Sequence, residues 1–327
     1  MAVYTELSLA MADRVAREHG LGGARGVEPV LAGSVNSNFF VDADARRVFV
    51  RIYEEQDIEG LAYEWSLLTH LQRAGLPVPV RVSGPGPGSL RVAGKPLGVF
   101  EVIGGDESCQ ARIDEGRAEA VGAFLGRAHR AGQTFPIRRQ GRFGRPALRA
   151  RVAEVKALRR AELADALQEV GGALDAVDAA WDTSLPSGIV HGDLFRDNVR
   201  WEGPRIVGAL DWESASHGLY VYDLAVCLLS WCYGDAFRWD LARAMARGYE
   251  GVRPLEWAER RFLPVALTAA AARFTITRIT DYHLRAGSAQ VHKDYRRFLA
   301  RLRLVRATDR WAARLASRAA QPRRGGG

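Results

Sequence analysis

The residue pattern with the clearest chemical content lies between His191 and Asp211. His191-Gly192-Asp193 is followed by Asn198 and, thirteen residues later, by Asp211. Phosphoryl transfer needs an acidic group that orients the attacking hydroxyl and accepts its proton, and oxygen ligands that hold Mg²⁺ against nucleotide phosphates. Asp193 suits the first task, and Asn198 and Asp211 suit the second. A single Asp or Asn in a loop often only stabilises a turn, but this constellation favours a catalytic loop.

A small polar segment near the amino terminus could hold phosphate groups. It lies between two predicted strands, 27–31 and 39–41, where small residues would let backbone N–H groups approach phosphate oxygens. The segment matches neither a Walker A sequence nor GxGxxG, and ordinary hairpin turns use the same residue types. The predicted phosphate-contacting residues are Gly33, Ser34, Asn36, Ser37 and Asn38.

Arg51 and Glu64 could form an ion pair that positions the phosphates. Arg51 falls in the predicted strand 48–53, and Glu64 falls in the helix predicted over 58–74. Protein kinases use a lysine on the strand, but arginine keeps its charge and offers a planar fork of donors to phosphate. An exposed strand arginine with no ligand would give the same sequence, so both interpretations stay open.

The segment before Gly104-Gly105 is predicted to be a hinge. Its backbone groups would hydrogen-bond adenine between apolar walls, and the residues assigned to it are Phe100, Glu101 and Val102. An ordinary buried strand would have the same composition.

Hydrophobic periodicity predicts two parts that would position these residues. Up to residue 104, one helix over 8–19, the helix over 58–74 and several strands (27–31, 39–41, 48–53, 78–82, 90–92 and 97–103) predict a small antiparallel sheet. Beyond it, helices are predicted over 116–131, 149–180, 221–231, 235–250, 255–284 and 295–320, with a β island over 189–210 that carries the catalytic pattern. We therefore predict an α+β fold with domains 1–104 and 105–320, followed by a flexible tail, 321–327.

Composition limits the possible classes of protein. The 327 residues are 47% hydrophobic and 26% charged, which excludes intrinsic disorder and allows roughly two domains. The sequence has no run of about 18 apolar residues and no signal-like start, and its three cysteines form no disulfide framework. We expect a cytoplasmic protein that does not bind a membrane. The sequence carries no signal for an oligomeric state.

The chain resembles the aminoglycoside-phosphotransferase-like kinases, and among them type II homoserine kinases. His191-Gly192-Asp193, Asn198 and Asp211 carry the wider resemblance. The narrower one depends on 35–39, 75–79, 194–199, 222–228 and 248–255, and the similarity covers nearly the whole chain. The resemblance implies a bilobal protein-kinase-like fold and ATP-dependent phosphorylation of the L-homoserine hydroxyl, a step toward threonine, with Mg²⁺ on Asn198 and Asp211.

The resemblance also suggests supporting and substrate-binding roles. His191 would brace the catalytic loop, and Asp223, expected at the N-cap of the helix that follows it, would anchor that loop. An amino-acid substrate needs partners for its ammonium and carboxylate groups. The candidates are Trp231, Arg273, Arg278, Asp281 and Tyr282; a buried structural salt bridge would give the same residues.

Two alternatives remain open. Relatives with the Asp211-Trp212-Glu213 form include kinases of other small alcohols, such as aminoglycosides, choline-like compounds or amino sugars. The second alternative is a nucleic-acid-binding protein, because the net charge of +8 is concentrated in residues 296–324, with ten arginines and one acid. The arginines Arg303, Arg306, Arg310, Arg314 and Arg318 would form one stripe on a helix whose other face holds Phe298, Leu302, Val305, Ala312 and Leu315. A solvated basic face on a packed helix is the preferred interpretation, so we expect a small-molecule partner and no nucleic acid.

Overall fold

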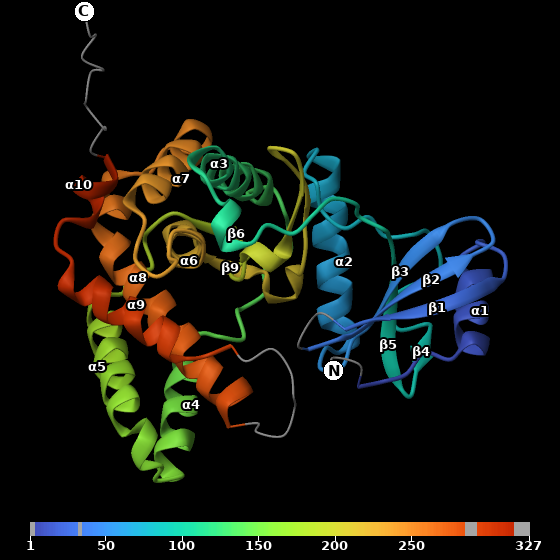
Figure 1. Ribbon diagram of the computed structural model, residues 1–327, viewed down its shortest axis with the longest axis horizontal. Helices are drawn as coiled ribbons and strands as arrows, with labels where there is room; N and C mark the ends of the chain where they lie inside the picture. Colours follow the sequence, from blue (N-terminus) through green and yellow to red (C-terminus); the bar gives the residue numbers. More distant parts are fainter. Residues whose placement is uncertain (1–3, 32–34, 285–292, 317–327) are drawn as a thin grey trace, which may run out of the picture.

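The computed structural model describes residues 4–31, 35–284 and 293–316 (Figure 1). A five-stranded antiparallel sheet forms one end of the molecule, and a larger, mostly helical part forms the other. This arrangement confirms the predicted α+β architecture. The order of strands in the sheet is β1-β2-β3-β5-β4. Its elements are α1 (Leu9–Glu18), β1 (Ala24–Val30), β2 (Ser37–Ala43), β3 (Arg47–Ile52), α2 (Ile58–Arg73), β4 (Arg91–Val92) and β5 (Lys95–Glu101).

Two hydrophobic cores support the sheet and the helical part. Helix α1 packs Ala12, Val15 and Ala16 into the core of the sheet. Helix α2 begins at the Asp57 cap and lies between the sheet and the helical part in Figure 1. Its buried leucines belong to the larger core of the helical part rather than to the sheet core. Helix α2 therefore ties the small lobe to the large one.

The prediction of a strand over 78–82 is wrong. Only Arg81 forms a bridge, with Phe100, although Val80 and Val82 hydrogen-bond along β5. Pro77 and Pro79 lack backbone N–H groups, so this segment cannot complete a ladder. It lies alongside β5 as an extended chain.

Helices surround the β island in the larger part of the molecule. The α-helices are α3 (Glu115–Gly132), α4 (Arg145–Ala157), α5 (Ala164–Ala180), α6 (Tyr220–Trp231), α7 (Trp239–Val252), α8 (Trp257–Arg278), α9 (Arg296–Ala307) and α10 (Trp311–Ala316), and a π-helical turn, Ile279–His283, follows α8. The island contains two antiparallel pairs, β6 (Ser187–Val190) with β9 (Ser216–Leu219) and β7 (Val199–Glu202) with β8 (Arg205–Ala209). Helix α6 is buried at the centre of this part (Figure 1).

Helices α3 and α7 cross at very short range. A Cβ atom added at Gly122 of α3 would lie 2.0 Å from the carbonyl oxygen of Met245 in α7. A real Cβ cannot approach backbone that closely, so only glycine allows this contact. The two helices therefore pack backbone against backbone at this crossing.

Two predicted helices are each divided in the structure. The helix predicted over 149–180 becomes α4 and α5, separated at Arg159, whose φ is 52°. The helix predicted over 295–320 becomes α9 and α10, separated near Arg310, whose φ is 55°. A left-handed residue ends an α-helix because its backbone cannot continue the right-handed turn.

The break between α9 and α10 removes the predicted continuous arginine stripe. Arg303 pairs with Glu169 at 2.6 Å, and Arg314 donates to the carbonyl of Asp309 at 3.2 Å. The apolar side of the prediction is confirmed, because Phe298, Leu302, Val305 and Leu315 are buried, whereas Ala312 is half-buried. Arg318 lies outside the described residues, as does the tail 321–327.

Within the described residues, one helical stretch has the length and composition of a membrane span. It is Trp257–His283, formed by α8 and the turn after it, and 78% of its apolar window is buried inside the protein. Such burial is typical of a core helix in a folded domain.

Candidate active site

A pocket of about 180 Å³ brings ten of the twenty predicted site residues together. Its walls come from the β1–β2 connection, β3, the β island, the end of α8 and the residues preceding α9. The predicted residues that line it are Asn36, Asn38, Arg51, Asp193, Asn198, Asp211, Arg273, Arg278, Asp281 and Tyr282. Residues far apart in sequence therefore converge where the small and large lobes meet.

Asp223 holds the loop that carries Asp193. Its two carboxylate oxygens accept hydrogen bonds from the backbone N–H groups of His191 and Gly192, each at 2.7 Å. Burial opposes its charge, but a hydrogen bond from His129 at 3.1 Å and the backbone bonds keep the pKa of Asp223 below its usual value. The predicted N-cap position is wrong: α6 begins at Tyr220, so Asp223 lies in the first turn of the helix.

The imidazole of His191 lies between two backbone groups. Nδ1 accepts from the N–H of Asp193 at 3.2 Å, and Nε2 lies 3.0 Å from the carbonyl oxygen of Leu210. A neutral ring with its proton on Nε2 satisfies both contacts. Burial lowers the pKa of His191, which favours that neutral form. This geometry suits a bracing role.

Arg273 supports the catalytic loop from the helical side. Its guanidinium donates to the carbonyl oxygen of Gly192 at 2.5 Å and to the hydroxyl of Tyr222 at 3.3 Å. Gly192 has φ of 74°, a conformation that favours glycine and turns the chain toward Asp193. Arg273, one of the predicted substrate contacts, thus contacts the loop backbone and also lines the pocket.

Asp193 carries the most strongly perturbed carboxyl of the catalytic loop. Burial raises the pKa of Asp193 to about 7, although the positive charges of Arg273 and Lys293 oppose the rise. A carboxylate with a pKa near neutrality can accept a proton from a reacting group. Asp193 is therefore poised for general-base chemistry.

Asn198 and Asp211 are placed by the β7–β8 hairpin. The Asn198 amide donates to the carbonyl oxygen of Asp193 at 2.8 Å, which leaves its Oδ1 as an acceptor. Asp211 follows β8 with φ of 62°, a left-handed conformation that Asp tolerates better than most residues. One amide oxygen and one carboxylate in the same pocket form a donor set that Mg²⁺ accepts, with waters and substrate phosphates completing its coordination.

Arg51 lies among three carboxylates. Its Nη1 is 3.1 Å from Glu213, 3.6 Å from Asp211 and 4.0 Å from Glu64. Burial lowers the pKa of Arg51, but the surrounding negative charges, with Glu213 and Asp211 the largest, outweigh burial and raise the pKa overall. The predicted pair with Glu64 is therefore the longest of the three contacts.

Glu64 is almost completely buried, with 2% of its surface exposed. Burial, reinforced by the charge of Glu213, raises the pKa of Glu64 to about 8. Its Oε2 has no hydrogen-bond partner among the described residues. Burial therefore favours the protonated form of Glu64, and Glu213 is the closer partner of Arg51.

The predicted phosphate loop is only partly represented in the pocket. Asn38 accepts from Nε of Arg51 at 3.2 Å, and the Asn36 amide donates to Glu213, so both face the site. Ser37 points away: it is fully buried, donates to Glu54 at 2.5 Å and accepts two backbone bonds from the amino-terminal segment. Including the Ser37 hydroxyl among the phosphate contacts was therefore wrong. Gly33 and Ser34 lie outside the described residues.

The predicted hinge coincides with the end of β5. Phe100 is buried in the large core, Glu101 pairs with Arg46 at 3.0 Å, and Val102 is 40% exposed. Beyond it, Gly105 has φ of 85°, and an added Cβ would lie 2.7 Å from the carbonyl of Trp201. The chain thus passes from the sheet to the β island against the backbone of β7.

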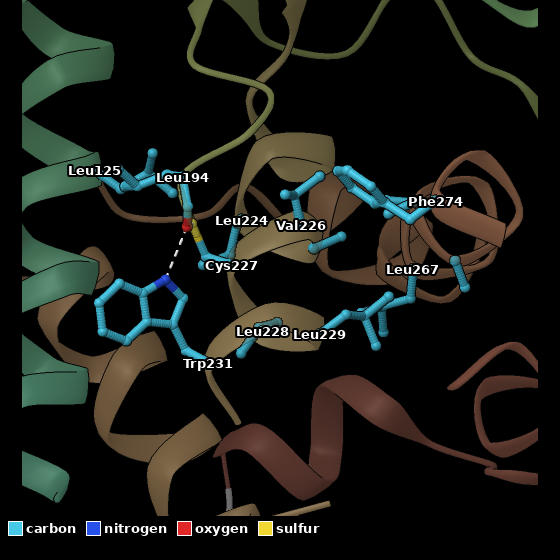
Figure 2. Packing of buried hydrophobic residues seen from close by; sticks show 14 of the residues in the cluster. Leu125, Leu194, Leu224, Val226, Cys227, Leu228, Leu229, Trp231, Leu267 and Phe274 are labelled. Carbon is cyan, nitrogen blue, oxygen red and sulfur yellow. Dashed lines mark hydrogen bonds between the residues drawn. The ribbon is translucent and has the colours of Figure 1, made fainter. Parts of the chain in front are cut away.

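Trp231 was wrongly predicted as a substrate contact. Its side chain is fully buried, and its indole N–H donates to the carbonyl oxygen of Leu194 at 2.8 Å. Figure 2 shows this bond within the packed hydrophobic residues around α6. Trp231 holds the catalytic loop from inside the core, because a buried indole N–H needs an acceptor.

Glu213 and Lys293 line the pocket but are not among the residues predicted from the sequence. Glu213 lies two positions after Asp211, and its acidic type next to the predicted metal ligand could have suggested a role. Lys293 precedes α9, eighty-two residues after Asp211, and no local pattern marks it. Only the tertiary structure brings Lys293 beside the catalytic loop.

The family model described as "Phosphotransferase enzyme family" matches residues 26–263, which include every residue of the β island. The chain belongs to the phosphotransferase enzyme family. The catalytic pattern from His191 to Asp211 predicted this class correctly.

Curated relatives confirm the resemblance to homoserine kinases. A homoserine kinase of Methylobacterium radiotolerans is 34% identical over 308 residues, covering 92% of this chain and 95% of the relative. A homoserine kinase of Brucella suis is 33% identical over 321 residues, covering 94% of this chain and 96% of the relative. The similarity is therefore nearly full-length in both directions.

Solved structures confirm the protein-kinase-like fold. A spectinomycin phosphotransferase in complex with ADP and spectinomycin aligns with a TM-score of 0.69 at 11% identity, over 94% of this chain and 99% of that one. An amicoumacin kinase in complex with AMP-PNP and Ca²⁺ aligns with a TM-score of 0.65 at 17% identity, over 86% of each chain. At these identities the likeness concerns the fold alone.

Proposed function

We propose that this protein transfers the γ-phosphoryl group of ATP to the side-chain hydroxyl of L-homoserine in the cytoplasm, on the route to threonine. The observation that carries the proposal is the presence of Asp193, Asn198, Asp211 and Arg51 in one pocket of a phosphotransferase-family protein. The nearly full-length relatives named homoserine kinase support the acceptor. The related folds solved with ADP or AMP-PNP support the nucleotide. Three unpaired cysteines are compatible with a reducing compartment.

The proposed reaction requires one proton transfer and one phosphoryl transfer. Asp193 orients the acceptor hydroxyl and takes its proton, while the hydroxyl oxygen forms a bond to the γ-phosphorus and the bond from that phosphorus to the bridging oxygen breaks. ADP leaves with the electrons of the broken bond. The raised pKa of Asp193 suits this acceptor role because the carboxylate gains a proton readily near neutral pH.

Other residues bind and orient the nucleotide in this proposal. Arg51, Asn36 and Asn38 contact its phosphates, and the segment from Phe100 to Val102 lies along adenine. Asn198 and Asp211 would hold Mg²⁺, which neutralises phosphate charge when bound. His191 and Asp223 maintain the catalytic loop through the backbone contacts described above.

The proposal is tested by measuring ADP release with homoserine, serine, choline and kanamycin in parallel. We expect homoserine to give the highest kcat/KM. Asp193→Asn should lower kcat with homoserine by about a hundredfold or more, the contribution expected of a general base. Asp175→Asn is a matched control, because the Asp175 side chain on α5 is 70% exposed.

The outcomes separate substrate from mechanism. Turnover of another alcohol without turnover of homoserine would refute the acceptor and leave the kinase assignment intact. Full activity of Asp193→Asn would refute the role of Asp193.

A further inference from the structure

Two cations in the active-site pocket have no role in the phosphoryl transfer described above. Arg278 ends α8, and Lys293 lies just before α9, so different segments deliver them to the pocket that contains Asp193. Asp193 contributes to the pKa of each cation by its charge, and Lys293 in turn acts on Asp193. Both positive charges therefore lie within electrostatic reach of the proposed catalytic carboxylate.

Most of the N–H donors of Arg278 are available to a ligand. Among the described residues its guanidinium donates only to the carbonyl oxygen of Asp294, at 3.1 Å, and it lies 4.4 Å from the centre of the Phe298 ring. Burial lowers the pKa of Arg278 to about 10, which shows that placing the charge here costs free energy. A guanidinium has five N–H donors in a fixed fork that matches a carboxylate, and buried charges normally have an ionic partner.

Lys293 remains charged in the same place. Burial disfavours its charge, but Tyr282, Asp197 and Asp193 together raise its pKa above the usual value. Its distance from Asp197 is 3.7 Å, and the Asp197 side chain is 56% exposed. This loose, solvated pair leaves the ammonium able to contact an incoming anion.

We propose, building on the function above, that Arg278 and Lys293 form the subsite for the α-carboxylate of the acceptor. In homoserine a short carbon chain separates the hydroxyl from the carboxylate, so the carboxylate must lie close to Asp193 when the hydroxyl contacts it. Arg278 and Lys293 satisfy this requirement because both line the same pocket as Asp193, and the charge of Asp193 acts on each of them. The subsite selects hydroxylated amino acids over alcohols that lack a carboxylate.

The test compares homoserine with 3-aminopropan-1-ol, which has the same chain and ammonium group without the carboxylate. Arg278→Met and Lys293→Met should each raise KM for homoserine by about 10- to 100-fold, the range for a hydrogen bond to a charged group. The ratio of kcat/KM values between homoserine and 3-aminopropan-1-ol should fall by the same factor, while KM for ATP stays within about twofold of wild type. Arg306→Met, an exposed arginine of α9, is the control for removal of charge alone.

Each other outcome overturns a defined part of the reasoning. Equal losses with both acceptors in both variants would show a structural role and refute the subsite. A rise in KM for ATP with either acceptor would assign the two cations to the nucleotide phosphates instead. Efficient use of 3-aminopropan-1-ol by the wild-type protein would also refute the subsite.

The acceptor series further distinguishes the subsite from the proposed function. If homoserine is inactive but 4-hydroxybutyrate is phosphorylated and both variants lose that activity, the homoserine assignment fails and the carboxylate subsite stands. If homoserine is active and the variants do not discriminate between acceptors, the subsite alone fails. Thermal unfolding of each variant verifies that it is folded, and the two substitutions lie on independent segments.

Discussion

Because burial raises the pKa of Asp193, we expect the Asp193→Asn variant to be more stable than the wild-type protein. The size of this difference depends on pH. The folded-state pKa of Asp193 is about 7, compared with 3.8 for an ordinary aspartate. Folding therefore favours the protonated carboxyl. The resulting cost is absent below the unfolded-state pKa, grows as pH rises, and levels off above the folded-state pKa.

The size of the effect follows from the shift. A displacement of about three pKa units corresponds to roughly 4 kcal/mol at most. Between pH 5 and pH 8, the stability of Asp193→Asn relative to wild type should rise by roughly 2 to 3 kcal/mol, with most of the change below pH 7. Asparagine stays neutral throughout, so any change in hydrogen bonding adds only a constant offset.

Urea unfolding of the protein without nucleotide, followed at pH 5, 6, 7 and 8, measures this difference directly. The exposed Asp175→Asn variant is the control for removing one carboxylate elsewhere in the protein. A constant stability difference between Asp193→Asn and wild type across the range would refute the raised pKa and, with it, the reasoning that Asp193 is tuned by burial.

Further predictions concern catalysis and the supporting structure. With homoserine and saturating Mg-ATP, kcat/KM should rise about tenfold from pH 6 to pH 8 as Asp193 loses its proton; a flat profile would exclude control by this group. Trp231→Phe should lower the free energy of unfolding by about 1–3 kcal/mol, since a buried carbonyl loses its donor, while KM for homoserine stays at the wild-type value; a selective rise in KM would restore a substrate role. Asp223→Asn should cost about 2 kcal/mol in urea unfolding because two backbone N–H groups lose a charged acceptor, and an unchanged midpoint would contradict the anchoring role. Gly122→Ala should lower Tm by several degrees, because the added Cβ overlaps backbone of α7; an unchanged Tm would show that α3 and α7 can separate without cost.

The catalytic loop was predictable because its chemistry is encoded locally. Asp193 and Asn198 are five residues apart, and a single hairpin then brings Asp211 to them. The loop and the hairpin are both short, so residues that are close in the sequence are also close in space. The division between the lobes near Gly104-Gly105 stays a prediction, drawn from the change from strand to helix periodicity there.

The predictions for the side chains of Ser37 and Trp231 are wrong because the direction of each side chain depends on residues that are distant in the sequence. Consecutive residues of a strand point to opposite faces, so Asn38 faces Arg51, its cross-strand neighbour, while Ser37 faces the amino-terminal segment and Glu54. Residue type alone could not separate the two. Trp231 was misassigned for the same reason: its acceptor, the carbonyl of Leu194, comes from a loop thirty-seven residues away.

Burial explains how several acidic groups can share one small site. Burial is the leading cause of the raised pKa of Asp193, Glu64 and Glu213, whereas Arg51 stays charged at the centre of the cluster. If all of these acids were ionised together, the single positive charge of Arg51 would not balance their negative charges in a region of low dielectric. Keeping some of them protonated reduces the negative charge that an incoming triphosphate must meet. The same burial that makes Asp193 a suitable proton acceptor thus also moderates the repulsion between the site and its proposed nucleotide.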